Sequence, residues 1–168
     1  MKEEIIDIIK KGADNLTISI NVTVEQLINL FDNEELFTQI SIYLDDTTIK
    51  RREWVICIRT LCQIDKVKAN ERFVQLLKSE NPEKRYRLVQ HLSGCGTQYI
   101  VPALVEILKE DPSPDIRCIV ASALGDIGDS RALPALNWAA KNDHDANYEN
   151  TLVSNQAQHS INLINNKM

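Results

Sequence analysis

The chain has little glycine, little proline and few aromatic residues: five glycines, five prolines and 5 % Phe, Trp and Tyr among 168 residues. No apolar run approaches the roughly 18 residues that a membrane span needs. The first residues, MKEEIIDIIKKG, are charged and interrupted, which does not fit a secretory signal. With Leu, Ile, Ala, Glu and Lys abundant, this composition favours helix over sheet. We therefore expect a helical, cytoplasmic protein with no membrane-spanning segment.

Paired cysteines and an excess of basic residues are also missing. Cys57, Cys62, Cys95 and Cys118 form no CxxC pair and show no metal-ligand spacing, so reduced thiols are the simplest interpretation. The net charge of −5 argues against general binding to nucleic acid, whose phosphates require clustered Lys and Arg. An acidic surface suits a basic protein partner, although the same charge also serves solubility.

The segment from Asp111 to Trp138 predicts two short helices and the corner between them. Ser113 can cap the first helix and Pro114 suits its first position. Gly128 is expected to end it, and Asp129 or Ser130 can cap the second helix. One apolar face recurs at helical spacing in the first helix: Ile116, Val120, Ala123, Leu124 and Ile127. Such a helix pair has a flat apolar side that needs neighbours of the same shape.

The chain supplies these neighbours through an internal repeat. Seven residues of this segment have identical counterparts 32 residues earlier, among them Pro114 with Pro82 and Arg117 with Arg85. A fixed period of this size predicts an array of helical repeats. The residues DIRCIVASALGDIGD and ALPAL resemble the HEAT-like repeat first recognised in phycobilisome lyases. The resemblance implies an all-α fold, a right-handed α-α superhelix.

The same period divides the chain into one repeat domain of about four helical pairs. Residues 1–46 are expected to form a degenerate N-terminal cap, 47–141 the clear repeats, and 142–168 an insertion loop and a closing helix. Within the cap, Gly12 predicts the end of a first helix, and the alternation of apolar and polar residues over 16–24 predicts an extended segment or strand edge. Thr23 then begins a capping box for the next helix.

Catalytic and metal-binding patterns are weak. Deoxyhypusine hydroxylases of HEAT-like architecture bind iron through His-Glu pairs, but His91, His144 and His159 are followed by Leu, Asp and Ser. Cys95 lies between two glycines in an expected turn near a helix N-terminus, a position that favours a thiolate. It aligns with the expected core residue Ile127, however, so we expect a packing role. We expect no catalytic residues, no cofactor and no bound metal.

Basic residues cluster in Lys50-Arg51-Arg52 and Lys84-Arg85-Tyr86-Arg87. HEAT-like DNA glycosylases use a basic concave face, but here acidic residues surround both clusters, so we expect solvated helix ends. Arg85 and Arg117 recur at the repeat period, and the resemblance implies that they bridge to Asp in neighbouring repeats. Asp126 and Asp129 fit that structural role.

The expected binding surface combines the second helix of each pair with the insertion loop. Trp138 is the most informative residue, because its counterpart one repeat earlier is charged Glu106. It is either an interface anchor or a side chain packed beneath the loop. The candidate partner-binding residues are Tyr99, Glu106, Arg131, Trp138, Asp143, Asp145, Tyr148 and Glu149.

These residues predict a non-enzymatic module that binds a basic protein partner through its concave face and C-terminal loop. A bacterial immunity protein that neutralises a basic toxin is one form of this hypothesis. A bilin lyase or chromophore-handling subunit, which the resemblance suggests, is the alternative, and a HEAT-like DNA glycosylase is a third.

Overall fold

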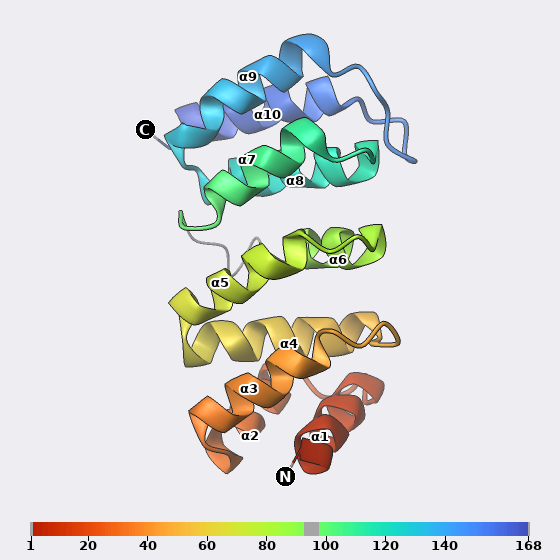
Figure 1. Ribbon diagram of the computed structural model, residues 1–168, viewed down its shortest axis with the longest axis vertical. Helices are drawn as coiled ribbons and strands as arrows, with labels where there is room; N and C mark the ends of the chain where they lie inside the picture. Colours follow the sequence, from red (N-terminus) through yellow and green to blue (C-terminus); the bar gives the residue numbers. More distant parts are fainter. Residues whose placement is uncertain (1, 93–97, 168) are drawn as a thin grey trace. The chain divides into compact units, whose positions relative to one another are not determined.

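The computed structural model describes residues 2–92 and 98–167, and within these ranges the protein is all-α, with ten α-helices, one short 3-10 helix and no strand. The predicted all-α fold of helical repeats is confirmed, and Figure 1 labels its helices in chain order. Four helical pairs follow one another along the chain, and a closing helix comes after them: α2/α3 (Ile20–Leu30, Asn33–Tyr43), α4/α5 (Arg51–Ile64, Lys66–Leu77), α6/α7 (Pro82–Leu92, Val101–Glu110), α8/α9 (Pro114–Ile127, Leu133–Asn142) and then α10 (Val153–Asn165). No helix in the described ranges is both long and apolar enough to cross a membrane.

The chain divides into two compact units, Met1–Arg72 and Phe73–Met168. The sequence-based boundaries at 46 and 141 stay predictions. Unit 1 contains α1 (Lys2–Asp14), α2 (Ile20–Leu30), α3 (Asn33–Tyr43), α4 (Arg51–Ile64) and the first part of α5 (Lys66–Leu77). Unit 2 contains the end of α5, α6 (Pro82–Leu92), α7 (Val101–Glu110), α8 (Pro114–Ile127), a 3-10 helix (Ser130–Ala132), α9 (Leu133–Asn142) and α10 (Val153–Asn165).

Helix α4 is the centre of unit 1, where it contacts α1, α2 and α3. It buries the bulky side chains of Trp54, Ile56, Ile58 and Leu61. Val55 on the same helix is only half-buried.

The predicted extended segment over 16–24 is wrong. The Asn15 side chain accepts hydrogen bonds from the Thr17 amide (3.1 Å) and hydroxyl (2.7 Å), which stabilises a turn. Ser19 then caps α2 by accepting from the amide of Asn21, so the helix begins four residues before the predicted capping box would place it. The apolar alternation arises from a turn followed by a helix, and Leu16 is 77 % exposed.

Gly12 does not end the first helix, which continues to Asp14. Its role is close packing: a Cβ atom at Gly12 would overlap the side chain of Thr23 on α2. The missing side chain therefore lets α1 and α2 approach each other closely.

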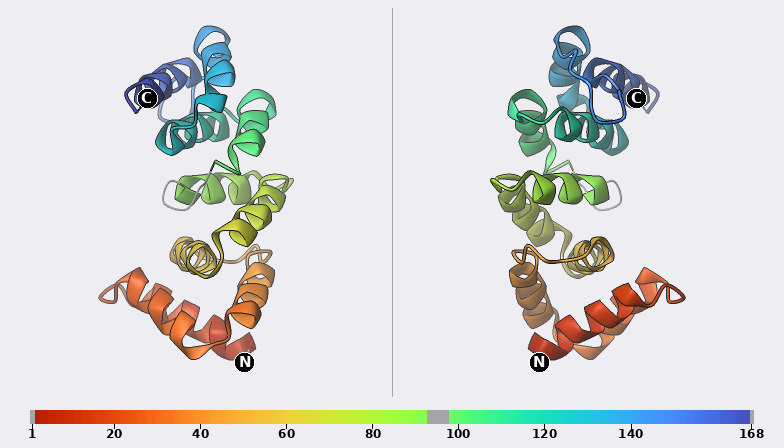
Figure 2. Two further views of the ribbon diagram at one scale, coloured as in Figure 1. Left: turned by 90° about the vertical axis from the view of Figure 1, so that its left-hand side faces the viewer. Right: turned by 90° about the vertical axis from the view of Figure 1, so that its right-hand side faces the viewer.

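Unit 2 has two layers, with α6, α8 and α10 in one and α7 and α9 in the other (Figures 1 and 2). Helix α8 is its centre, because it contacts α6, α7 and α10. Both predicted ends of α8 are confirmed. Pro114 is its first residue, and Gly128 adopts a left-handed conformation (φ 77°, ψ 21°) with its amide donating to the carbonyl of Leu124.

The closing helix α10 packs closely on α8. A Cβ atom at Gly125 would lie 2.9 Å from the Cα atom of Ser160, so the two backbones approach where neither side chain is large. After α10, the Lys167 ammonium donates to the carbonyls of Gly125 (3.2 Å) and Asp126 (2.7 Å) near the end of α8. These carbonyls carry the negative end of the helix dipole, so the cation stabilises them.

The packing at Gly12 gives a first prediction. Gly12→Ala should lower the free energy of unfolding by about 1–3 kcal/mol, because the added methyl group overfills the contact with Thr23. Adding Thr23→Ala should recover part of that loss, because it removes the overlapping atoms. Urea unfolding of the single and double variants measures both effects. Lys10→Ala, on the exposed side of α1, is the matched control, and an equal loss there would contradict the packing explanation.

Candidate functional site

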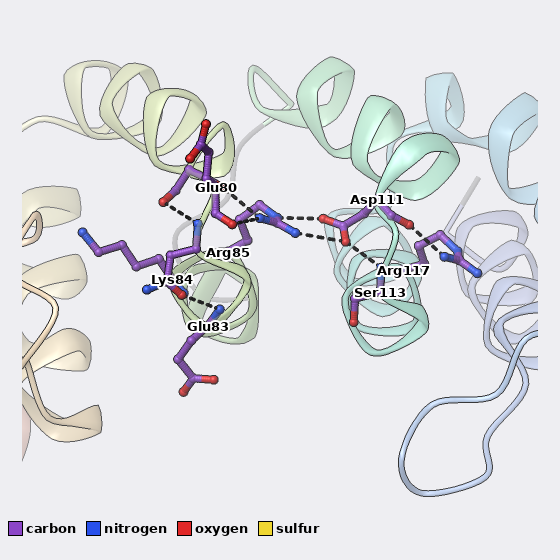
Figure 3. Close-up of polar contacts among 9 residues, drawn as sticks. Glu80, Glu83, Lys84, Arg85, Asp111, Ser113 and Arg117 are labelled. Atoms are coloured by element: carbon purple, nitrogen blue, oxygen red, sulfur yellow. Dashed lines mark hydrogen bonds and ion pairs between the residues drawn. The ribbon is translucent and has the colours of Figure 1, made fainter.

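Buried ion pairs join successive repeats of unit 2. Figure 3 shows the first of them, between Arg85 and Asp111, and the contact of Arg117 with Asp111. The Arg85 guanidinium, in the first turn of α6, donates to both carboxylate oxygens of Asp111 at 2.7 and 3.2 Å. It also donates to the carbonyl of Ser79 (2.7 Å) just after α5. Asp111 is the C-cap of α7, so Arg85 connects the ends of α5 and α7. We call this arrangement and its repeat at Arg117 the Arg–Asp ladder.

The second part of the ladder repeats this geometry one repeat later. Arg117 donates to both oxygens of Asp143, the C-cap of α9, at 2.7 and 3.1 Å. It also donates to the main-chain carbonyl of Asp111 at 2.8 Å. Hydrogen bonding to Asp143 and Asp145 raises the pKa of the Arg117 guanidinium despite its burial. Asp111 thus binds both arginines, one through its side chain and the other through its backbone.

The bridging role that the resemblance implied for the two arginines is present, but its acidic residues are Asp111 and Asp143. Asp126 is exposed on α8. Asp129 instead caps the 3-10 helix by accepting from the amide of Arg131 at 2.9 Å. The Arg131 guanidinium also binds the Asp129 carboxylate, at 2.6 Å, and lowers the pKa of that carboxyl.

The predicted partner-binding residues therefore do not all lie on one accessible surface. Asp143 is only 7 % exposed, and its carboxylate belongs to the Arg–Asp ladder, so it is not available for direct contact with a partner. Asp145 also binds Arg117, at 2.6 Å, but its side chain is 67 % exposed. Arg131 is held by Asp129 and by the carbonyl of Gln98.

Four of the predicted residues belong to the α7/α9 layer or its immediate connections. Tyr99 and Trp138 are half-exposed, at 56 % and 50 %. Glu106 is exposed on α7, one repeat before Trp138. We call Tyr99, Glu106, Arg131 and Trp138 the second-helix surface. Beside Trp138 lies a cavity of 250 Å³ whose other lining residues are Lys109, Arg117, Asn142, Asp143, His144 and Asp145.

Tyr148 and Glu149 lie on the other layer. The loop after Asp143 runs from α9 to the start of α8, where the Tyr148 amide donates to the Asp115 carboxylate at 2.7 Å (Figure 1). An isolated bridge between Ala146 and Leu152 closes the base of the loop. The cavities that Tyr148 lines share no residue with the cavity beside Trp138. The structure thus separates the predicted surface into two.

Two of the described cysteines, Cys57 and Cys118, are buried, and Cys62 is half-buried. Cys57 is fully buried in α4, and burial raises the pKa of its thiol. Cys118 is 5 % exposed, and burial raises the pKa of its thiol to about 11. Both groups are protonated at neutral pH, which disfavours a role as nucleophile. The prediction for Cys95 lies outside the described residues.

The predicted histidines lie at ordinary helix and loop positions, whereas the second basic cluster is not the solvated helix end that was expected, because Arg85 is buried in the Arg–Asp ladder. His144 and His159 are exposed and His91 is half-buried on α6. The described residues contain no group of three or more His, Cys, Asp or Glu side chains that could hold a metal ion. In the basic clusters, Lys50 pairs with Asp14 at 2.9 Å and Arg87 pairs with Glu83 at 2.6 Å.

A family model for HEAT repeats matches residues 70–154, half of the chain. With the stacked helical pairs and the Arg–Asp ladder in place, the chain belongs to the HEAT-repeat family. HEAT repeats are typical of protein-interaction and scaffold modules, and the match does not single out the phycobilisome lyase type. A comparison with curated proteins gave no match.

The ladder gives a second prediction. Asp143→Ala should lower the free energy of unfolding by about 3–5 kcal/mol, because it removes the carboxylate that accepts two hydrogen bonds from the buried Arg117 guanidinium. Asp145→Ala removes another carboxylate from the same arginine but should cost no more than about 1 kcal/mol, since the Asp145 side chain is 67 % exposed and Asp143 still binds the guanidinium. Urea unfolding compares the two, and equal losses would refute the structural role of Asp143.

Proposed function

We propose that the protein is a non-enzymatic interaction module that binds a protein partner through the second-helix surface of unit 2. Trp138 is the anchor of this surface, and its exposure is the observation that carries the proposal. Trp138 remains 50 % exposed beside a cavity, so a partner can bury apolar surface that the fold leaves in contact with water. Tryptophan is also among the residues that contribute most to protein interfaces.

The course of the loop supports this role for Trp138. If the loop covered the indole, Trp138 would be a packing residue. Instead the loop tip is hydrogen bonded to Asp115 on α8, and half of the indole surface stays accessible. Tyr99 adds a second exposed aromatic ring on the same layer, and Glu106 and Arg131 provide polar groups on that layer.

Charge favours a basic partner. The chain carries 24 acidic and 19 basic residues, and the arginines of unit 2 at 85, 117 and 131 are bound by its own carboxylates. Opposite charge on a partner would accelerate association and orient the encounter. Neutralisation of a basic toxin by a bacterial immunity protein is one specific form of this proposal, supported by the small size and acidic charge of the chain.

Affinity capture from the native cells tests the proposal. Trp138→Ala should reduce recovery of the partner at least tenfold, because loss of an anchor residue costs about 2 kcal/mol or more. Leu30→Ala is the matched control, since Leu30 is a similarly exposed apolar residue in unit 1. Unchanged capture by a Trp138→Ala, Tyr99→Ala double variant would exclude this surface. Because the proposed partner is basic and this chain is acidic, capture should weaken as the salt concentration is raised.

A further inference from the structure

A second surface of unit 2 lies on the α6/α8 layer, where two cavities adjoin. One has a volume of 480 Å³ and the other 310 Å³, and they share Tyr86, Asp115 and Tyr148. Glu83 lines the larger cavity and Glu149 the smaller one. We call these two tyrosines and three carboxylates the tyrosine groove.

Hydrogen bonds fix the loop side of the groove. Asp115 accepts from the Tyr148 amide at 2.7 Å, and the Tyr148 hydroxyl donates to Glu149 at 3.0 Å. Hydrogen bonds to Glu149 and Tyr86 raise the pKa of Tyr148 to about 12, so its phenol is neutral near pH 7. The Tyr148 side chain nevertheless stays 71 % exposed. The groove is thus organised before any ligand binds, with one aromatic ring presented to solvent.

The charge of the groove has one sign. Neither cavity has a Lys, Arg or His among its described lining residues, whereas Glu83, Asp115 and Glu149 each contribute a carboxylate. Arg87, which lines neither cavity, pairs with Glu83 and partly neutralises the charge of that carboxylate. A carboxylate has about four acceptor sites, so Asp115 and Glu149 can accept further hydrogen bonds from a cation.

The walls of the groove favour a cation with a long apolar stem. Pro82 and Ile116 line the larger cavity and Ile119 lines the smaller one. Arginine and lysine both combine an aliphatic stem with a charged end. Arginine fits better, because its planar guanidinium stacks on aromatic rings and its five N–H donors match separate carboxylates.

We infer that the tyrosine groove binds an arginine side chain of the protein partner, with the guanidinium against Tyr86 and Tyr148 and hydrogen bonded to Asp115 and Glu149. This inference rests on the proposed protein-binding function and adds a recognition site on a different layer from Trp138. The partner then contacts unit 2 in two places, with an apolar anchor at one and a cation at the other.

Nuclear magnetic resonance titration of the full chain with acetyl-arginine amide tests the inference directly. Amide shifts should concentrate in the loop over 146–151, in α6 and at the start of α8, and should saturate in the millimolar range expected of one side chain. Acetyl-citrulline amide has a similar shape without the charge and should give no saturating shifts. Nα-acetyl-lysine amide, whose side chain keeps its charge, should bind at least threefold more weakly than Nα-acetyl-arginine amide.

Variants of the exposed groove residues sharpen the test. Tyr148→Ala should weaken arginine binding roughly threefold to tenfold through the loss of ring stacking. Glu149→Gln should also weaken it, whereas Glu106→Gln, which makes the same charge change on α7, should not. Equal effects of the two Glu→Gln changes would show only long-range attraction and overturn the inference.

Other outcomes would overturn it as well. Equal shifts with citrulline, lysine binding as tight as arginine, or the same saturating shifts with Ca²⁺ or Mg²⁺ would each exclude an arginine site. The two proposals fail separately. Loss of arginine binding with Trp138-dependent capture intact refutes only the groove, and arginine binding without Trp138-dependent capture refutes only the second-helix surface.

Discussion

Buried guanidinium groups hold the repeats of unit 2 in register. Each arginine of the ladder binds a carbonyl that follows one second helix and the aspartate that caps the next, so Arg85 joins α5 to α7 and Arg117 joins α7 to α9. A buried cation without these acceptors would be costly, and therefore the interaction penalises any slip between neighbouring helical pairs. Both surfaces proposed for binding depend on that alignment, because one is built on α7 and α9 and the other on α6 and α8.

The sequence predicted the architecture of unit 2 well, for reasons that are local. Pro114 and Gly128 act through neighbouring residues, and the structure confirms the ends of α8 that they predict. The repeat was visible because each helical pair carries the same local signals. The aspartates that pair with the arginines were not identified, because Arg85 and Asp111 are 26 residues apart and meet only when the helices stack. The repeat itself contained the signal, since Asp111 and Asp143 are also 32 residues apart.

The N-terminal cap and the site show what pattern alone misses. Glycine commonly ends helices, but at position 12 it allows close packing against Thr23 on another helix. The apolar alternation before Val24 was interpreted as extended although a turn at Asn15 and a cap at Ser19 produce it. Likewise, Trp138 and Tyr148 are close in sequence but line separate cavities. Tyr86 was predicted only as part of a basic cluster, although it lines the same cavity as Tyr148.

The position of the insertion has a consequence for how such a protein can change. The extra residues follow Asp143, which is already bound to Arg117, and precede α10, which packs on α8 independently of the loop tip. Beyond Asp145, which also binds Arg117, the segment can therefore vary in length and composition while the ladder and the core stay the same. Because the proposed tyrosine groove includes Tyr148 and Glu149 of this segment, changes within the loop would alter the groove while leaving the helices that present it unchanged.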